Sequence, residues 1–214
     1  MAAADFFEIT IHGKSSHAGV CPEAGIDAIV ISSELILSLQ TIVSRQVGPK
    51  DTAVVSVCTI EGGNAANIIA DKVKITGTIR TLDQDVHEKV LQLMQSRCDV
   101  FAEMYDTRID LNYFYRTPLT INHERIVQVA IDSAKKIFDE ENISDDISIM
   151  GGEDFAYIAQ QTPSCFALLG TKVEHGTAYP LHSPKMCVNE DALPLGAAYL
   201  AQTALDLLNS TNKK

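Results

Sequence analysis

His17 lies in a stretch of small and polar residues, 13–19, that also carries Lys14. An imidazole changes its charge near neutral pH, so it can move a proton or bind a metal. A loop held between regular elements is a common place for such groups. His17 could therefore act on a bound substrate. The alternative is that His17 and Lys14 are solvated loop residues.

Asn67 and Arg80 form a second candidate pair. Asn67 follows the Gly62-Gly63 turn, and Arg80 lies near the end of the strand predicted after it. An amide donor and a guanidinium fork suit a carboxylate or a developing oxyanion. We expect the two side chains to face one another across a hairpin. The alternative is that Asn67 serves its turn and Arg80 is a surface residue of its strand.

Two further loops carry candidate groups. Gly151 begins a glycine pair that is followed by Glu153 and Asp154, although acidic residues at such a place can serve only to cap the next helix. His182 lies between two prolines, a rigid setting that suits a metal ligand. One histidine is not a zinc site, because catalytic zinc needs about three protein ligands and an open position.

The elements that must position these residues begin with a first domain at residues 5–116. Alternating strands and apolar-periodic helices follow the order β-α-β-β-α-β there, which is the split ferredoxin-like pattern. The predicted strands are 6–12, 52–60, 68–82 and 108–115, and the predicted helices begin near Asp27 and Asp83. His17, Asn67 and Arg80 all fall within this domain.

A domain boundary is predicted at residues 116–118, where Pro118 interrupts both neighbouring patterns. Residues 117–214 are then predicted to form three helices, with short apolar strands at 147–150 and 166–170. Such strands are typical of a parallel sheet, which needs neighbouring strands and helices on both faces. The second domain is therefore predicted to be an α/β domain with an incomplete sheet.

Composition argues against several classes of protein. The net charge of -11 disfavours nucleic acid and anionic membranes as partners. Five scattered cysteines, an odd number, argue against a disulfide framework and indicate reduced thiols. The sequence shows no leader-like segment and no apolar run near the roughly 18 residues of a membrane span. We therefore expect a cytoplasmic protein.

Five segments, taken in order, resemble the metallopeptidase family that includes aminoacylase, hippurate hydrolase and the indole-acetyl-amino-acid hydrolases. They are 7–18 (FEITIHGKSSHA), 62–69 (GGNAANII), 77–81 (GTIRT), 151–155 (GGEDF) and 181–184 (LHSP). Each segment alone is a weak signal, whereas five in matching order and spacing are a strong one. The resemblance covers nearly the whole chain.

The resemblance implies roles for the candidate residues. His17 would reach into the partner subunit's site and stabilise the tetrahedral intermediate. Asn67 and Arg80 would bind the substrate carboxylate or polarise the scissile carbonyl. Gly151 would contact substrate from a turn near the site, and His182 would bind metal.

The resemblance also implies an architecture. Residues 5–116 would be a ferredoxin-like lid through which family members form homodimers, and 117–214 the C-terminal part of a catalytic α/β domain. The implied cofactor is a divalent metal, zinc first, with manganese, cobalt or nickel as alternatives. The implied reaction is metal-assisted hydrolysis of an N-acyl amino acid or a similar amide.

The family's other metal ligands and its general-base glutamate come from sequence upstream of the lid. This chain would then be the distal half of an amidohydrolase, inactive by itself. The alternative is a non-catalytic dimerisation module that pairs with itself or with a separate N-terminal half.

Overall fold

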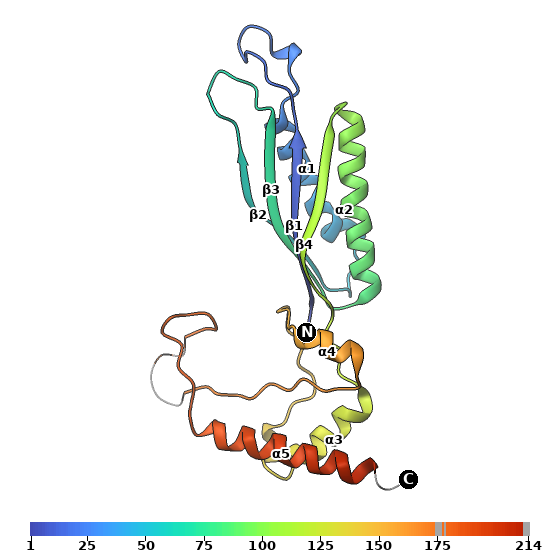
Figure 1. The fold of residues 1–214 in the computed structure, drawn as a ribbon, viewed down its shortest axis with the longest axis vertical. Helices are drawn as coiled ribbons and strands as arrows, with labels where there is room; N and C mark the ends of the chain where they lie inside the picture. Colours follow the sequence, from blue (N-terminus) through green and yellow to red (C-terminus); the bar gives the residue numbers. More distant parts are fainter. Residues whose placement is uncertain (174–176, 178, 212–214) are drawn as a thin grey trace. The chain divides into compact units, whose positions relative to one another are not determined.

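The computed structural model describes residues 1–173, 177 and 179–211, which fall into two compact units (Figure 1). Unit 1 comprises Met1–Thr120 and the returning segment Ile149–Tyr157. Unit 2 comprises Ile121–Ser148 and the described part of Ile158–Lys214. The boundary predicted near Pro118 stays a prediction.

Unit 1 is a four-stranded antiparallel sheet with both long helices on one face (Figure 1). Its elements are β1 (Ala3–His12), a 3-10 turn (Pro22–Ala24), α1 (Ala28–Thr41) with a π-helical extension (Ile42–Gln46), β2 (Ala53–Gly62), β3 (Lys72–Thr81), α2 (Gln84–Met104) and β4 (Arg108–Thr117). The strand order is β2-β3-β1-β4, and every neighbouring pair is antiparallel. This topology confirms the predicted ferredoxin-like β-α-β-β-α-β fold.

Alternation along β3 assigns the two faces of the sheet. Val73, Ile75 and Ile79 are buried against the helices, while Lys72 and Lys74, at alternate positions of the strand, point the other way. This period of two is the geometry of a pleated strand with one buried face. We call the face without helices, which carries the even-numbered residues of β1 and β3, the open face.

Both long helices begin at capping aspartates. Asp27 accepts the Ile29 N–H and Asp83 accepts the Val86 N–H, each at 2.9 Å. Such bonds satisfy donors that the first helical turn leaves unpaired. The helices and the sheet enclose one hydrophobic core. Its largest fully buried side chains are Phe7, Ile9, Ile11, Ile31, Leu35, Leu39, Ile42, Val73, Ile75, Ile79, Val90 and Met94.

The segment Ala28–Gln46, which is α1 and its extension, has the length and composition of a membrane-crossing helix. The sequence analysis did not identify this segment, because it looked for an uninterrupted run of apolar residues, and polar residues interrupt this one. In the structure, Ala28, Ile31, Leu35 and Leu39 recur at helical spacing and are buried. The segment therefore packs as a core helix of unit 1.

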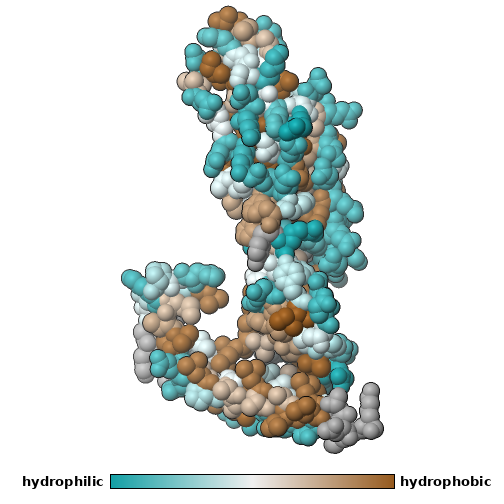
Figure 2. Space-filling model, in the orientation of Figure 1, coloured by the Kyte–Doolittle hydropathy of each residue, from teal (hydrophilic) through white to brown (hydrophobic). Residues whose placement is uncertain are grey.

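Unit 2 consists of helices and extended loops. Its elements are α3 (Glu124–Ala134), a 3-10 turn (Glu140–Asn142), part of α4 (Phe155–Gln161) and α5 (Ala192–Thr211). The ends of α3 and α5 are joined at Asp206, which accepts from Lys136 Nζ and from Ser133 Oγ, both at 2.7 Å. Hydrophobic side chains also gather on the exposed side of α5 (Figure 2). They include Leu193, Leu195, Leu200, Leu205 and Leu208.

Residues 147–150 and 166–170, predicted as short strands, do not form strands. A strand requires a ladder of bonds to a neighbour, and these segments bond elsewhere. The Ile149 carbonyl accepts the Ala2 N–H at 3.0 Å, and the backbone of Phe166 bonds the side-chain amide of Asn122 at 2.8 and 3.0 Å. The described residues of unit 2 contain no strand, so the predicted parallel sheet is not formed there.

Candidate functional site

His17 and Asn67 lie on two loops of unit 1 that are hydrogen-bonded to each other. The Ala18 N–H donates to the Asn67 carbonyl at 3.0 Å, and the Ile69 N–H donates to the Ser16 carbonyl at 2.9 Å. These bonds hold the loop after β1 against the loop between β2 and β3. The structure therefore brings His17 and Asn67 into neighbouring positions at one end of the sheet.

The ring of His17 is exposed, and its own loop selects which nitrogen is free. The Gly19 N–H donates to Nδ1 of His17 at 3.2 Å. Because Nδ1 accepts this bond, the neutral ring carries its proton on Nε2. His17 can therefore offer an Nε2–H donor to an oxygen outside its loop.

Arg80 lies at the other end of the same sheet. It pairs with Ala4 of β1 and Val54 of β2, whereas the loop that holds Asn67 enters β3 at Lys72. From Lys72 to Arg80 the strand spans about 26 Å at the usual rise per residue. The expectation that Asn67 and Arg80 face one another across a hairpin is therefore wrong.

The Arg80 guanidinium lies on the open face over an aromatic ring. Its Cζ is 5.5 Å from the centroid of the Phe6 ring, and Phe6 stacks on Phe114 with the centroids 5.9 Å apart. One of its nitrogens donates to the backbone carbonyl of Ile79 at 3.3 Å. Within the described ranges no carboxylate forms an ion pair with Arg80. Its remaining donors are suited to the carboxylate of a ligand.

The glycine pair at Gly151 belongs to the Arg80 end of unit 1. The Ala2 N–H donates to the Gly151 carbonyl at 3.1 Å. A Cβ on Gly152 would lie 2.5 Å from the Cβ of Ala4, so only glycine fits this close approach. Because Ala4 pairs with Arg80, the structure brings Gly151 and Arg80 to the same end, away from His17 and Asn67.

His182 lies in a tight turn of unit 2 and is exposed. The Ser183 N–H donates to the Pro180 carbonyl at 3.1 Å, and His182 has φ of 68°. A positive φ at this third position is the geometry of a type II turn, which favours glycine or asparagine. A histidine held there is strained, and strain of this kind clusters at functional sites.

The part of the chain that the structure describes contains no group of three or more His, Cys, Asp or Glu side chains able to hold a metal. His182 is therefore not part of a group of three such ligands among these residues, and a catalytic zinc needs about three. The metal-binding role of His182 stays a prediction.

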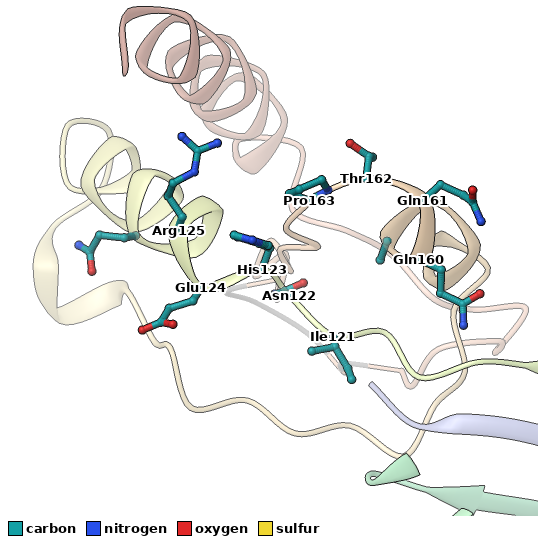
Figure 3. Close-up of a pocket in the computed structure, with 11 residues that line it drawn as sticks. Ile121, Asn122, His123, Glu124, Arg125, Gln160, Gln161, Thr162 and Pro163 are labelled. Atoms are coloured by element: carbon teal, nitrogen blue, oxygen red, sulfur yellow. The ribbon is translucent and has the colours of Figure 1, made fainter. Parts of the chain in front are cut away.

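A cavity of about 940 Å³ lies in unit 2, between the start of α3 and the end of α4 (Figure 3). Its charged lining residues, Glu124 and Arg125, point away from each other (Figure 3). None of the five predicted site residues lines it. The two segments that form it are distant in the sequence, so no local pattern indicated it.

The sequence analysis also did not predict a buried polar group around Asp5, at the Arg80 end of the sheet. The Asp5 carboxylate is 1% exposed, and its Oδ2 lies 3.3 Å from Nε2 of His87 and 3.6 Å from Nε of Arg116. Nδ1 of His87 also bonds the Thr81 hydroxyl at 3.1 Å. The available signal was an aspartate at an inward position of an apolar strand. This group connects α2 with the ends of three strands.

Comparison with known proteins supports the interpretation of unit 1 as a dimerisation domain. Residues 4–106 match the family described as the peptidase dimerisation domain. The chain is 34% identical over 213 residues to N-acetyl-L-cysteine deacetylase of Bacillus subtilis. This alignment covers 100% of this chain and 50% of that protein. It is 33% identical over 216 residues to IAA-amino acid hydrolase ILR1-like 2 of Arabidopsis thaliana, covering 100% and 49%.

A solved structure from Bacillus subtilis, described as a dinuclear metal binding peptidase from the M20 family, has a TM-score of 0.77 and 27% identity. The similarity covers 98% of this chain and 51% of that one. The chain thus spans about half the length of the relatives it matches. The resemblance drawn from the five sequence segments is confirmed. Residues 4–106 of the chain are thus an M20 peptidase dimerisation domain, and over its whole length the chain is similar to about half of the hydrolases and peptidases named here.

Proposed function

We propose that the protein is a metal-dependent amidohydrolase that cleaves N-acyl amino acids or similar amides, working as a homodimer and together with an upstream half. One observation carries this proposal: the His17 loop and Arg80 lie at opposite ends of one sheet, because β3 spans about 26 Å from Lys72, which pairs with His12 at the start of that loop, to Arg80. A second copy related by a two-fold axis can place its own His17 loop beside the Arg80 end of the first. The separation therefore supports a site shared between two subunits.

His17 is the proposed oxyanion donor. Its Nδ1 already accepts the Gly19 N–H, so its Nε2–H is the group that would bond the oxygen of the tetrahedral intermediate. Donors placed where charge develops stabilise the transition state more than the ground state. The amide of Asn67, on the neighbouring loop, would add a second donor at the same place.

Arg80 is the proposed carboxylate-binding group. It has no acidic partner among the described residues, and a guanidinium fork binds a carboxylate through two parallel bonds. Gly151 lies at the same end of unit 1, so its backbone is in position to line the site. Together these residues would fix the amino-acid part of the substrate.

The described residues do not form a metal site by themselves. We place the divalent metal on His182 together with ligands of the upstream half. Zinc is the first choice, with manganese, cobalt or nickel as alternatives. Without that half we expect this chain to be inactive.

We place the homodimer interface along β2 and the outer side of α1. β2 is an edge strand, so one row of its N–H and C=O groups has no neighbour in the sheet. Val54 and Ile60 on β2 are exposed, as are Val30 and Leu37 on α1. The family description as a dimerisation domain supports self-association of unit 1.

A second candidate function is a non-catalytic dimerisation module, which pairs with itself or with a separate N-terminal half. The lack of a metal-binding group among the described residues favours this role for the chain alone. The two candidates differ in what happens when an upstream half is supplied.

The test is an assay of N-acyl amino acid hydrolysis by this chain, alone and mixed with the upstream half of the Bacillus subtilis deacetylase. We expect no turnover alone and chelator-sensitive turnover in the mixture. In the mixture, His17→Ala should lower kcat far more than it changes KM, while Lys14→Ala on the same loop should leave both nearly unchanged. Chelator-sensitive hydrolysis by the chain alone would contradict the need for an upstream half. A dimer that stays inactive in the mixture would favour the module.

A further inference from the structure

Two aromatic rings on the open face, at the Arg80 end of unit 1, have no role in the function proposed above. Phe6 of β1 and Phe114 of β4 stack with 17° between their planes. Phe114 is 64% exposed, although large apolar side chains are usually buried. We call Phe6, Phe114 and Arg80 together the aromatic ledge.

A β-bulge gives Phe114 its position. Phe7 pairs with Tyr113 across β1 and β4, whereas Phe6 pairs with Tyr115, so Phe114 is the extra residue of the bulge. Bulges bend a strand and re-aim a side chain, and they are frequent next to active sites. The exposed ring is therefore held by the backbone of the sheet and not by a flexible loop.

Two cross-strand contacts elsewhere on the open face are polar. Lys74 forms an ion pair with Glu8 at 2.6 Å, and the hydroxyls of Thr59 and Thr76 are 2.6 Å apart. The aromatic ledge thus places an apolar surface next to a guanidinium at one end of this face. That combination suits a ligand that carries a carboxylate and an apolar group close together.

We propose that the aromatic ledge binds the apolar side chain of the amino-acid part of the substrate, which makes N-acyl derivatives of aromatic and other large apolar amino acids the preferred substrates. The inference rests on the proposed function in one respect, the binding of the substrate carboxylate by Arg80. In an N-acyl amino acid the carboxylate and the side chain leave the same carbon. A ligand held by Arg80, whose Cζ is 5.5 Å from the Phe6 ring, therefore has its side chain within reach of Phe6 and Phe114.

The test is an NMR titration of the 214-residue chain, with labelled phenylalanine and arginine, using N-acetylphenylalanine and N-acetylglycine. We expect N-acetylphenylalanine to bind about fivefold more tightly, the usual gain from one aromatic pair. Phe114→Ala should reduce this preference to less than about twofold. Val100→Ala, which shortens an exposed apolar side chain on α2, is the matched control and should retain the preference. Arg80→Gln should weaken the binding of both ligands to the same extent.

The outcomes separate this inference from the function on which it rests. If Arg80→Gln leaves the binding of both ligands unchanged, the carboxylate site and the proposed function fail together. If Arg80→Gln abolishes binding while Phe114→Ala keeps the full preference, only the role of the aromatic ledge is overturned. Equal binding of the two ligands, or no binding of either, also overturns it. Sedimentation of the same variants adds one more outcome: a dimer lost in Phe114→Ala, with ligand preference intact, would assign the ring to a subunit interface and overturn the inference.

Discussion

Removal of the Asp5 carboxylate would test how strongly the buried polar group stabilises unit 1. Asp5 is 1% exposed and its partner His87 is also buried, so neither side chain can recover its bonds from water. Removing one member of a buried polar pair leaves the other without its partner, which costs about 1–3 kcal/mol. We expect Asp5→Ala to lower the free energy of unfolding of unit 1 by about this amount, which is a large share of the roughly 5–15 kcal/mol of a typical domain.

The assay is urea denaturation followed through the backbone amide signals of β3, which report on unit 1 alone. A double-mutant cycle with His87→Ala isolates the interaction between the two side chains, and we expect a coupling energy of about 0.5–3 kcal/mol. Arg116→Ala is the control: its side chain is 57% exposed, so its loss should cost less than about 1 kcal/mol. Effects of Asp5→Ala and His87→Ala that add to within about 0.5 kcal/mol would refute the reasoning.

Three further predictions follow from single positions. Gly77→Ala would place a Cβ 2.1 Å from the Ser56 carbonyl oxygen, so the free energy of unfolding in urea should fall by about 1–3 kcal/mol. Gly170→Ala, with nothing within 4 Å, should leave it nearly unchanged, and equal effects would contradict the steric explanation. His182→Gly should raise stability in urea by about 1 kcal/mol, because it relieves the strain of a positive φ; a loss of stability would show that the histidine makes compensating contacts. Burial raises the pKa of the Cys98 thiol from 9.0 to about 12. Between these values the folded protein keeps the proton that the unfolded chain releases, so stability should fall as pH rises from 9 to 12. Cys98→Ala should flatten that part of the pH profile, and a wild-type profile that is already flat would contradict the prediction.

The fold of unit 1 could be predicted from sequence because its signals are local. The alternation around Val73 and Ile75 on β3 fixes both the strand and its buried face. Asp27 and Asp83 mark the starts of the two long helices by a side-chain bond to the next turn. Such patterns depend on residues a few positions apart, so the sequence contains them in full.

The features that the sequence did not predict correctly depend on contacts between residues far apart in the chain. The segment at 166–170 has the apolar content of a strand, but no neighbour pairs with it, and the backbone of Phe166 bonds Asn122 instead. Asn67 and Arg80 were expected to meet, yet the register of β3 with β1 and β2 puts them at opposite ends of the sheet. Phe114 was not singled out, since the bulge that exposes it exists only in the pairing of β4 with β1.

The length of the sheet in unit 1 also constrains how the sequence can change. β1 and β3 have ten residues each, and the loops that carry His17 and Asn67 lie beyond the same end of these strands. The number of residues in the strands therefore sets the spacing between these loops and Arg80. Inserting two residues into each strand would keep every side chain on its face, yet it would lengthen this spacing by roughly 7 Å. Proteins that use both ends of the sheet in one reaction should therefore tolerate substitutions in β1 and β3 more readily than insertions.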